Sequence, residues 1–401
     1  MQNFHVNSTL RFRAKEYQLM TSNNGQENKI VCSLFRSGEF INSKEIRYEQ
    51  KSDEGLLELI RQFHEQRKTE IEQLFYISER LKEENNSDLQ NMLGLIFAKN
   101  NMHSEAIREF TSVIDKNPNN SWAYENMGKA LLALKRYDAA VKAFERAIEI
   151  SPNYADLHNN MGLVYLERGE CKTAVDKFDK AIELNPYYAE AYFNKGLAYI
   201  LNQINRDDYS LSQNFPHEAT RALDKARLIN PSYQNDHFSN GLKHLNEGAF
   251  QKAFDAMKMA KRAGTRSLYR YEKYEYFLKL LFIEDANHFE MIWKYIKFLQ
   301  DLLKKFPSHA DIYNDLGLAY CMLRNYVNEK AINCFKSALE INPEFEKAQR
   351  NFKLSNYEQT GSELFLKAIT LKGQNNGKHR QMQLAEPNLE FPWVGMNAED
   401  E

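Results

Sequence analysis

Apolar residues in the middle of the chain recur at helical spacing in paired blocks, and the plan repeats every 34 residues. In residues 121–154 both blocks place apolar side chains three or four positions apart: Tyr124, Met127, Leu131 and Leu134, then Ala140, Val141, Phe144, Ala147 and Ile148. Such steps predict amphipathic helices, and Lys135-Arg136 between them predicts a tight turn. Because residues 87–120 and 155–188 share the plan, the pattern predicts repeated helix–turn–helix units.

Three further positions of the unit carry one kind of residue in nearly every copy. A glycine falls within the first helix, where it costs about 1 kcal/mol relative to alanine: Gly94, Gly128, Gly162, Gly196, Gly241 and Gly317. An alanine and a larger apolar residue follow in the second helix, as Ala140 and Phe144 do in the second unit. This arrangement predicts that the two helices of a unit approach too closely for a side chain at the glycine.

The small and large positions, in this register and at this period, resemble the tetratricopeptide repeat (TPR) family. The resemblance covers about residues 87–345 and implies a mainly α, right-handed solenoid of about seven helix-turn-helix repeats. Their expected bounds are near 87–120, 121–154, 155–188, 189–233, 234–267, 268–309 and 310–345. A capping helix region is expected over 346–371 and a flexible tail over 372–401.

The first 52 residues have a different pattern. Residues 9–20, 29–35 and 40–48 are strand-like and are separated by turn signals, which predicts a small module with a three-stranded antiparallel β-meander. Residues 53–86 should form a connecting helix that covers the sheet and leads into the first repeat. The module is interpreted as a cap on the solenoid, with a sensor or dimerisation role as the alternative.

Two other segments leave alternatives open. The fourth repeat has an insertion at residues 202–215, which is either a tolerated surface loop or a loop that contacts a partner. In the tail, residues 385–394 read AEPNLEFPWV. This stretch is either disordered without a function or a peptide that docks on its own or another groove.

Composition excludes several classes of function. Charged residues make up 27% of the 401 residues and the net charge is −2, so nucleic acid is not an expected partner. Apolar runs are too short for a membrane span, and the four cysteines, which form no CxxC pair, fit free thiols in the cytoplasm. Because nucleotide-binding, metal and nucleophile motifs are missing, the chain is expected to be no enzyme and to need no cofactor or metal.

The TPR resemblance implies a non-catalytic scaffold that binds partner peptides or helices in a concave groove formed by the first helices. The alternative is an oligomeric regulatory or structural protein that acts through its N-terminal β module. Self-association through that sheet or through the C-terminal tail therefore remains an open possibility beside a protein or peptide partner.

An asparagine recurs at one groove position, as Asn126, Asn160 and Asn194. Some TPR proteins, notably the sugar-transferring ones, have an asparagine ladder at the matching place. An asparagine amide can pair with both polar groups of a peptide backbone, so these residues are predicted to hold an extended peptide. Helix–helix hydrogen bonding is the alternative role. Neighbouring positions would read the peptide side chains: Glu125, Lys129, Asn159, Leu163, Phe193 and Leu197.

Overall fold

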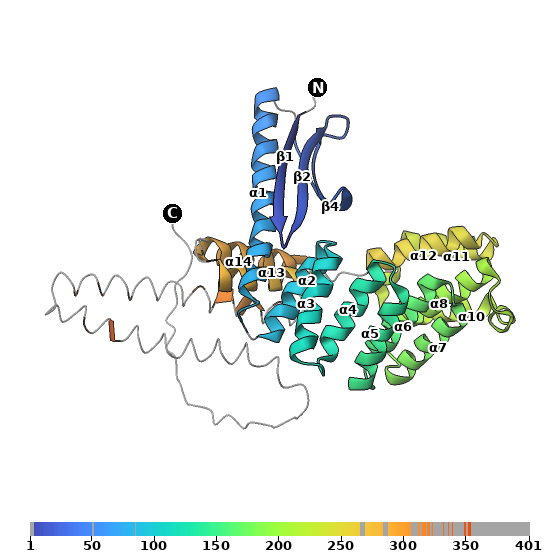
Figure 1. Ribbon diagram of the computed structural model, residues 1–401. Coiled ribbons are helices and arrows are strands. Elements are labelled where there is room, and N and C mark those ends of the chain that lie inside the picture. The colour runs from blue at the N-terminus through green and yellow to red at the C-terminus, as the bar shows by residue number, and fades with distance from the viewer. Residues whose placement is uncertain are drawn as a thin grey trace, which may run out of the picture. The chain divides into compact units, whose positions relative to one another are not determined.

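The fold is seen in a computed structural model (Figure 1). It describes residues 4–49, 52–84, 86–264, 269–283 and 288–305, together with scattered positions between 312 and 353. The chain divides into two compact units, Met1–Phe298 and Leu299–Glu401. The first unit contains nearly all of the described residues, and the following paragraphs concern it. Apart from Gln349, Phe352 and Lys353, the expected capping helix lies outside the described residues. The expected tail and most of the expected repeat at 310–345 lie outside them too.

The N-terminal module is a four-stranded antiparallel sheet in the order β1-β2-β3-β4. Its strands are β1 (His5–Phe12), β2 (Lys15–Asn24), β3 (Lys29–Arg36) and β4 (Glu39–Arg47). The prediction of three strands was therefore wrong, because residues 9–20 contain a hairpin. Arg13 and Ala14 form its turn with φ values of 47° and 60°. Glycine or asparagine usually supplies such backbone angles, so the sequence has no signal for this turn.

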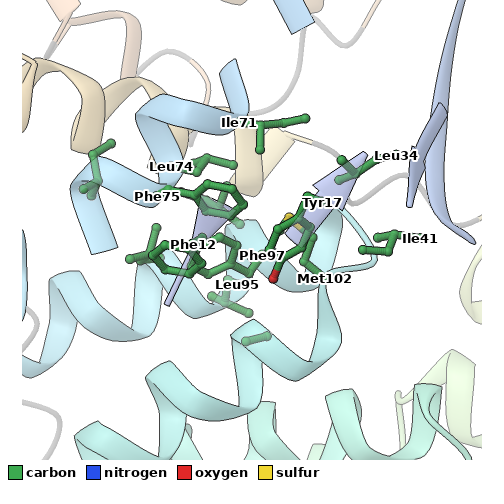
Figure 2. Packing of buried hydrophobic residues seen from close by; sticks show 14 of the residues in the cluster. Phe12, Tyr17, Leu34, Ile41, Ile71, Leu74, Phe75, Leu95, Phe97 and Met102 are labelled. Atoms are coloured by element: carbon green, nitrogen blue, oxygen red, sulfur yellow. The ribbon is translucent and has the colours of Figure 1, made fainter. Parts of the chain in front are cut away.

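Helix α1 (Asp53–Arg80) covers one face of the sheet and joins it to the repeats, as the sequence predicted. The sheet, α1 and the first repeat share one apolar core. In that core the ring of Phe12 from β1 stacks on Phe75 from α1 at 4.1 Å, and Phe97 from the first repeat lies 6.5 Å from Phe75 (Figure 2). The sheet is thus part of the first repeat's hydrophobic core.

Four helix pairs follow. They are α2 (Ser87–Lys99) with α3 (His103–Lys116), α4 (Ser121–Ala133) with α5 (Tyr137–Ile150), α6 (Ala155–Arg168) with α7 (Cys171–Leu184), and α8 (Ala189–Asn205) with α10 (His217–Ile229). The second helix of each of the first three pairs packs on the first helix of the next pair. The predicted close approach is confirmed, since a β-carbon at Gly128 would lie 2.7 Å from the Phe144 ring and one at Gly162 would lie 2.5 Å from Phe178.

The insertion in the fourth pair is folded back on α8. It contains the short helix α9 (Tyr209–Ser212), and Leu211 is buried there. The side chain of Asn202 accepts from the Asp208 amide at 2.8 Å and donates to the Asp208 carbonyl at 2.9 Å. Asp207 accepts from the backbone amide of Cys171 at 3.2 Å and so ties this segment to α7.

The fifth pair is turned relative to the four before it. It consists of α11 (Asp236–Asn246) and α12 (Phe250–Gly264), and it follows the 3-10 turn η1 (Pro231–Tyr233). Here the second helix, α12, is the one that packs on α8. Phe193 on α8 explains the difference, because Tyr233 and Phe238 lie 4.7 and 6.1 Å from its ring and draw η1 and the start of α11 toward it.

The next two helices are α13 (Tyr269–Phe282) and α14 (His288–Lys305). Both helices lie within residues 268–309, where the sequence predicts a helix–turn–helix repeat. Helix α13 packs against α2 and α1, near the beginning of the solenoid (Figure 1). The segment after α12 therefore returns to the first repeat.

Candidate functional site

The candidate site is the face of α2, α4, α6 and α8 that carries the recurring asparagines, here called the first-helix face. One position shows how open each part of this face is. The four equivalent residues are Leu95 (7% exposed), Lys129 (side chain 48% exposed), Leu163 (half-buried) and Leu197 (3% exposed). The face is thus open at α4, partly open at α6 and closed at α2 and α8.

The three asparagines of the predicted ladder are all buried, at 5%, 9% and 0% exposure for Asn126, Asn160 and Asn194. Asn194 donates to Asn159 at 2.8 Å, and Asn160 donates to Glu125 at 3.2 Å. Two of the three therefore bond to the neighbouring repeat, the alternative role that the sequence allowed. Among the described residues, Nδ2 of Asn126 has no hydrogen-bond partner.

Helix α12 covers the α8 end of this face. Its Lys261 donates to the Asn194 side-chain oxygen at 2.8 Å and pairs with Glu190 at 2.9 Å. Lys258 lies 3.4 Å from Glu167 on α6. Below these ion pairs, α12 contributes fully buried apolar residues to the core of α8: Ala253, Met257 and Ala260. Phe193 and Leu197, which were predicted to read a peptide, lie in that core, and Asn159 is likewise fully buried.

The open stretch on α4 and α6 contains the remaining predicted residues. Glu125 pairs with Lys129 at 2.5 Å, and both side chains remain accessible at 18% and 48%. Leu163 and Trp122 are half-buried. This stretch therefore offers an ion pair, apolar surface and the unpaired amide of Asn126 within two neighbouring helices. Binding at the predicted residues remains a prediction.

Sequence reasoning missed a buried charged junction between the sheet and the first repeat. Glu105 on α3 accepts from the Tyr17 hydroxyl at 2.7 Å and pairs with Lys15 and Arg36, each at 3.2 Å. One turn later Glu109 accepts from the Ser78 hydroxyl at 2.7 Å. A sequence signal existed, because the next repeat has alanines at the equivalent positions, 139 and 143.

The junction shifts the pKa values of its groups. Burial raises the pKa of Glu105, but the hydrogen bond from Tyr17 and the charges of Lys15 and Arg36 outweigh it, so the net pKa lies below the usual value of 4.5. Burial and the bond to Glu105 raise the pKa of Tyr17. Both directions favour an ionised Glu105 that accepts from a neutral Tyr17, as expected for a structural ion-pair network.

The described residues contain no cluster of histidine, cysteine or acidic side chains suited to a metal. His64 is buried under the sheet with Ser8 at 2.7 Å and Thr21 at 2.9 Å, and burial lowers its pKa. Those hydroxyls satisfy both ring nitrogens in the core. Cys32 and Cys171 are buried free thiols. Within the described helices, none combines the length and apolar character needed to cross a membrane.

Models of known protein families match the repeat segment of the chain. Family models described as "TPR repeat" match residues 128–169 and 162–203, and one described as "Tetratricopeptide repeat" matches 109–142. None of the curated proteins compared with the chain matches it.

Solved structures similar to this chain include three with different titles. MamA 41-end from Desulfovibrio magneticus RS-1 is 22% identical, with 45% of this chain and 98% of that chain covered and a TM-score of 0.34. YrrB, titled a TPR protein with an unusual peptide-binding site, is 16% identical over 49% and 95%, with a TM-score of 0.33. The first TPR of Spaghetti (RPAP3), bound to an HSP90 peptide, is 20% identical over 36% and 91%, with a TM-score of 0.25.

The family-model matches cover residues 109–203 and agree in register with the glycine and phenylalanine contacts seen inside each helix pair. On this agreement, residues 109–203 of the chain are tetratricopeptide repeats.

Proposed function

We propose that this chain is a non-catalytic interaction scaffold that binds a partner peptide along the open stretch of α4 and α6. The family points to protein binding on the first helices. In this chain α12 occupies the α8 end of that face, where Lys261 already bonds to Asn194. The peptide would therefore contact Asn126 and Asn160, with Glu125, Lys129 and Leu163 beside its side chains.

The observation that carries this proposal is the Asn126 amide. It is 95% buried, and its Nδ2 has no partner among the described residues. A buried amide donor without a partner costs about 1–3 kcal/mol. A peptide carbonyl that accepts from this amide would remove that cost. Asn160 lies one repeat further along the chain. Its amide would offer a second donor to the peptide when its hydrogen bond to Glu125 breaks.

The test is an Asn126→Ala/Asn160→Ala double variant. A partner is first captured with the wild-type chain, its binding segment is mapped, and that synthetic segment is titrated by calorimetry. Two lost hydrogen bonds at about 1 kcal/mol each predict an affinity about thirtyfold weaker. The matched control is Asn119→Ala/Asn153→Ala, which changes two exposed loop asparagines and should bind as the wild type does. Equal affinities of the test variant and the wild type, with equal melting temperatures, would refute the proposal.

A further inference from the structure

Helix α13 closes the α2 end of the first-helix face. Lys99 on α2 donates to Glu272 on α13 at 2.7 Å and lies 3.9 Å from Glu275. Next to this ion pair, Leu278 is fully buried in the core of the first repeat. Met92 on α2 and Phe277 on α13 are partly buried against the same core.

This closure differs in kind from that at the α8 end. Helix α12 is held by three fully buried apolar residues, whereas α13 has one, Leu278, among its described side chains, and the other apolar side chains here pack on the core only partly buried: Tyr274, Phe277, Phe282 and Ile283. The Lys99–Glu272 pair is partly exposed, at 22% and 23% of the two side chains. Water still reaches both side chains of this pair, and α13 has fewer fully buried side chains than α12, so α13 is held less firmly than α12.

The closed arrangement also leaves buried polar atoms unsatisfied. Among the described residues, Oε2 of Glu272 has no hydrogen-bond partner, and on α2 the amide of Asn91 is fully buried with neither its oxygen nor its nitrogen paired. Unpaired buried polar atoms penalise the state that contains them. Release of α13 would return the Glu272 carboxylate to water, and a different helix on α2 could pair with the Asn91 amide.

We infer that the α2 end of the first-helix face is a second docking surface. Its partner is a helix that carries an acidic residue beside a stripe of aromatic and aliphatic residues. In the absence of that partner, α13 covers the surface, and the partner displaces it. This inference rests on the proposed use of the first-helix face for binding. The chemistry of the partner follows from the contacts of α13: a carboxylate on Lys99, with apolar side chains against Met92 and the adjoining core. Release of α13 would add α2 to the open stretch, which would then consist of α2, α4 and α6.

The experiment uses the full chain and a fluorescent synthetic peptide with the sequence of residues 269–283 as the probe. In the Glu272→Lys variant the chain's own α13 meets Lys99 with a like charge, while the probe keeps its glutamate. The probe should bind this variant at least tenfold more tightly than it binds the wild type, measured by fluorescence anisotropy. Adding Lys99→Glu to Glu272→Lys restores an ion pair within the chain and should abolish the gain.

Glu149→Lys is the matched control, because Glu149 also pairs with a cation at 2.7 Å but on helix α5. It should bind the probe as the wild type does. Leu278→Ser weakens the packing of α13 on the first repeat without changing the charge, so it should also increase probe binding. This second variant keeps the test valid if Glu272→Lys does not fold. If the probe bound neither folded variant more tightly than the wild type, the inference would be overturned. Because these measurements need no natural partner and leave Asn126 and Asn160 intact, they can fail or succeed independently of the proposed peptide site.

Discussion

The residues predicted best from sequence are those whose partners lie within one repeat. The glycine and the large apolar residue of each unit were identified from period and size alone, and the structure brings them into contact. A contact between two helices joined by a tight turn is local and recurs with the period. Buried Glu105 at the sheet junction was missed because its partners lie 69 to 90 residues away in the chain, as Tyr17 does.

The glycine contacts predict the effect of enlarging that residue. Gly128→Leu and Gly162→Leu each place atoms where the Phe144 or Phe178 ring now lies, and overpacking of this kind costs about 1–3 kcal/mol. Chemical denaturation should show each variant losing that much free energy of unfolding. Ala139→Leu, at an exposed position of α5, should be nearly neutral. Unchanged stability in both glycine variants would mean that the helices can separate without cost.

The lowered pKa of Glu105 predicts a pH-dependent contribution to stability. When the pKa of a carboxylate is lower in the folded than in the unfolded state, the carboxylate stabilises the fold at pH values above its unfolded-state pKa. This contribution is lost as the pH falls through the folded-state pKa. Glu105→Gln should therefore be less stable than the wild type at pH 7, by about 1–3 kcal/mol for lost charged hydrogen bonds. The difference should shrink at pH 3 in thermal melts. A difference that does not depend on pH would show that shape, rather than charge, holds this junction.

At the scale of elements, the sequence pattern predicts which segments form helices better than it predicts how those helices pack. Helices α13 and α14 form where the sequence pattern is helical, yet the packing of α13 against the first repeat could not be read from that pattern. Periodicity describes which side of a helix is apolar and leaves open which helix covers it. For α12, the deciding residue is Phe193, a large ring at a position where the preceding repeats have Asn91, Glu125 and Asn159.

The turn between β1 and β2 shows a different limit. Residues with φ above zero are usually glycine, asparagine or aspartate, and Arg13 and Ala14 belong to none of these types. Tertiary contacts hold this turn, since Arg13 pairs with Glu79 at 2.8 Å and with Glu109 at 3.2 Å. Sequence patterns that register only local preference therefore merge the two strands into one.

At the scale of the molecule, the main revision concerns the independence of the N-terminal module. The sequence pattern predicts that the helices would survive removal of residues 1–52. In the structure, however, Leu10, Phe12, Tyr17 and Leu19 from the sheet are buried in the same core as Phe97 of the first repeat. The sheet and the first repeat should therefore unfold together.

Phe12→Ala tests that cooperativity. Phe12 is 5% exposed and stacks on Phe75, and loss of a buried phenylalanine ring costs about 3–5 kcal/mol. The variant should lower the melting temperature recorded by far-UV circular dichroism, in which helices dominate. Met20→Ala, a 46% exposed residue of the same sheet, should leave it unchanged. If Phe12→Ala altered only strand signals and left the helical melt in place, the two parts would be independent after all.

The two helices that cover the ends of the first-helix face also set how long a bound peptide can usefully be. Neighbouring packed helices lie about 8–10 Å apart, and an extended chain advances about 3.3–3.6 Å per residue. About three peptide residues thus separate the contact at Asn126 from the contact at Asn160. While α12 lies on α8 and α13 lies on α2, a longer extended ligand would gain no further contact at the proposed site. We therefore expect short linear segments to bind until α13 is released.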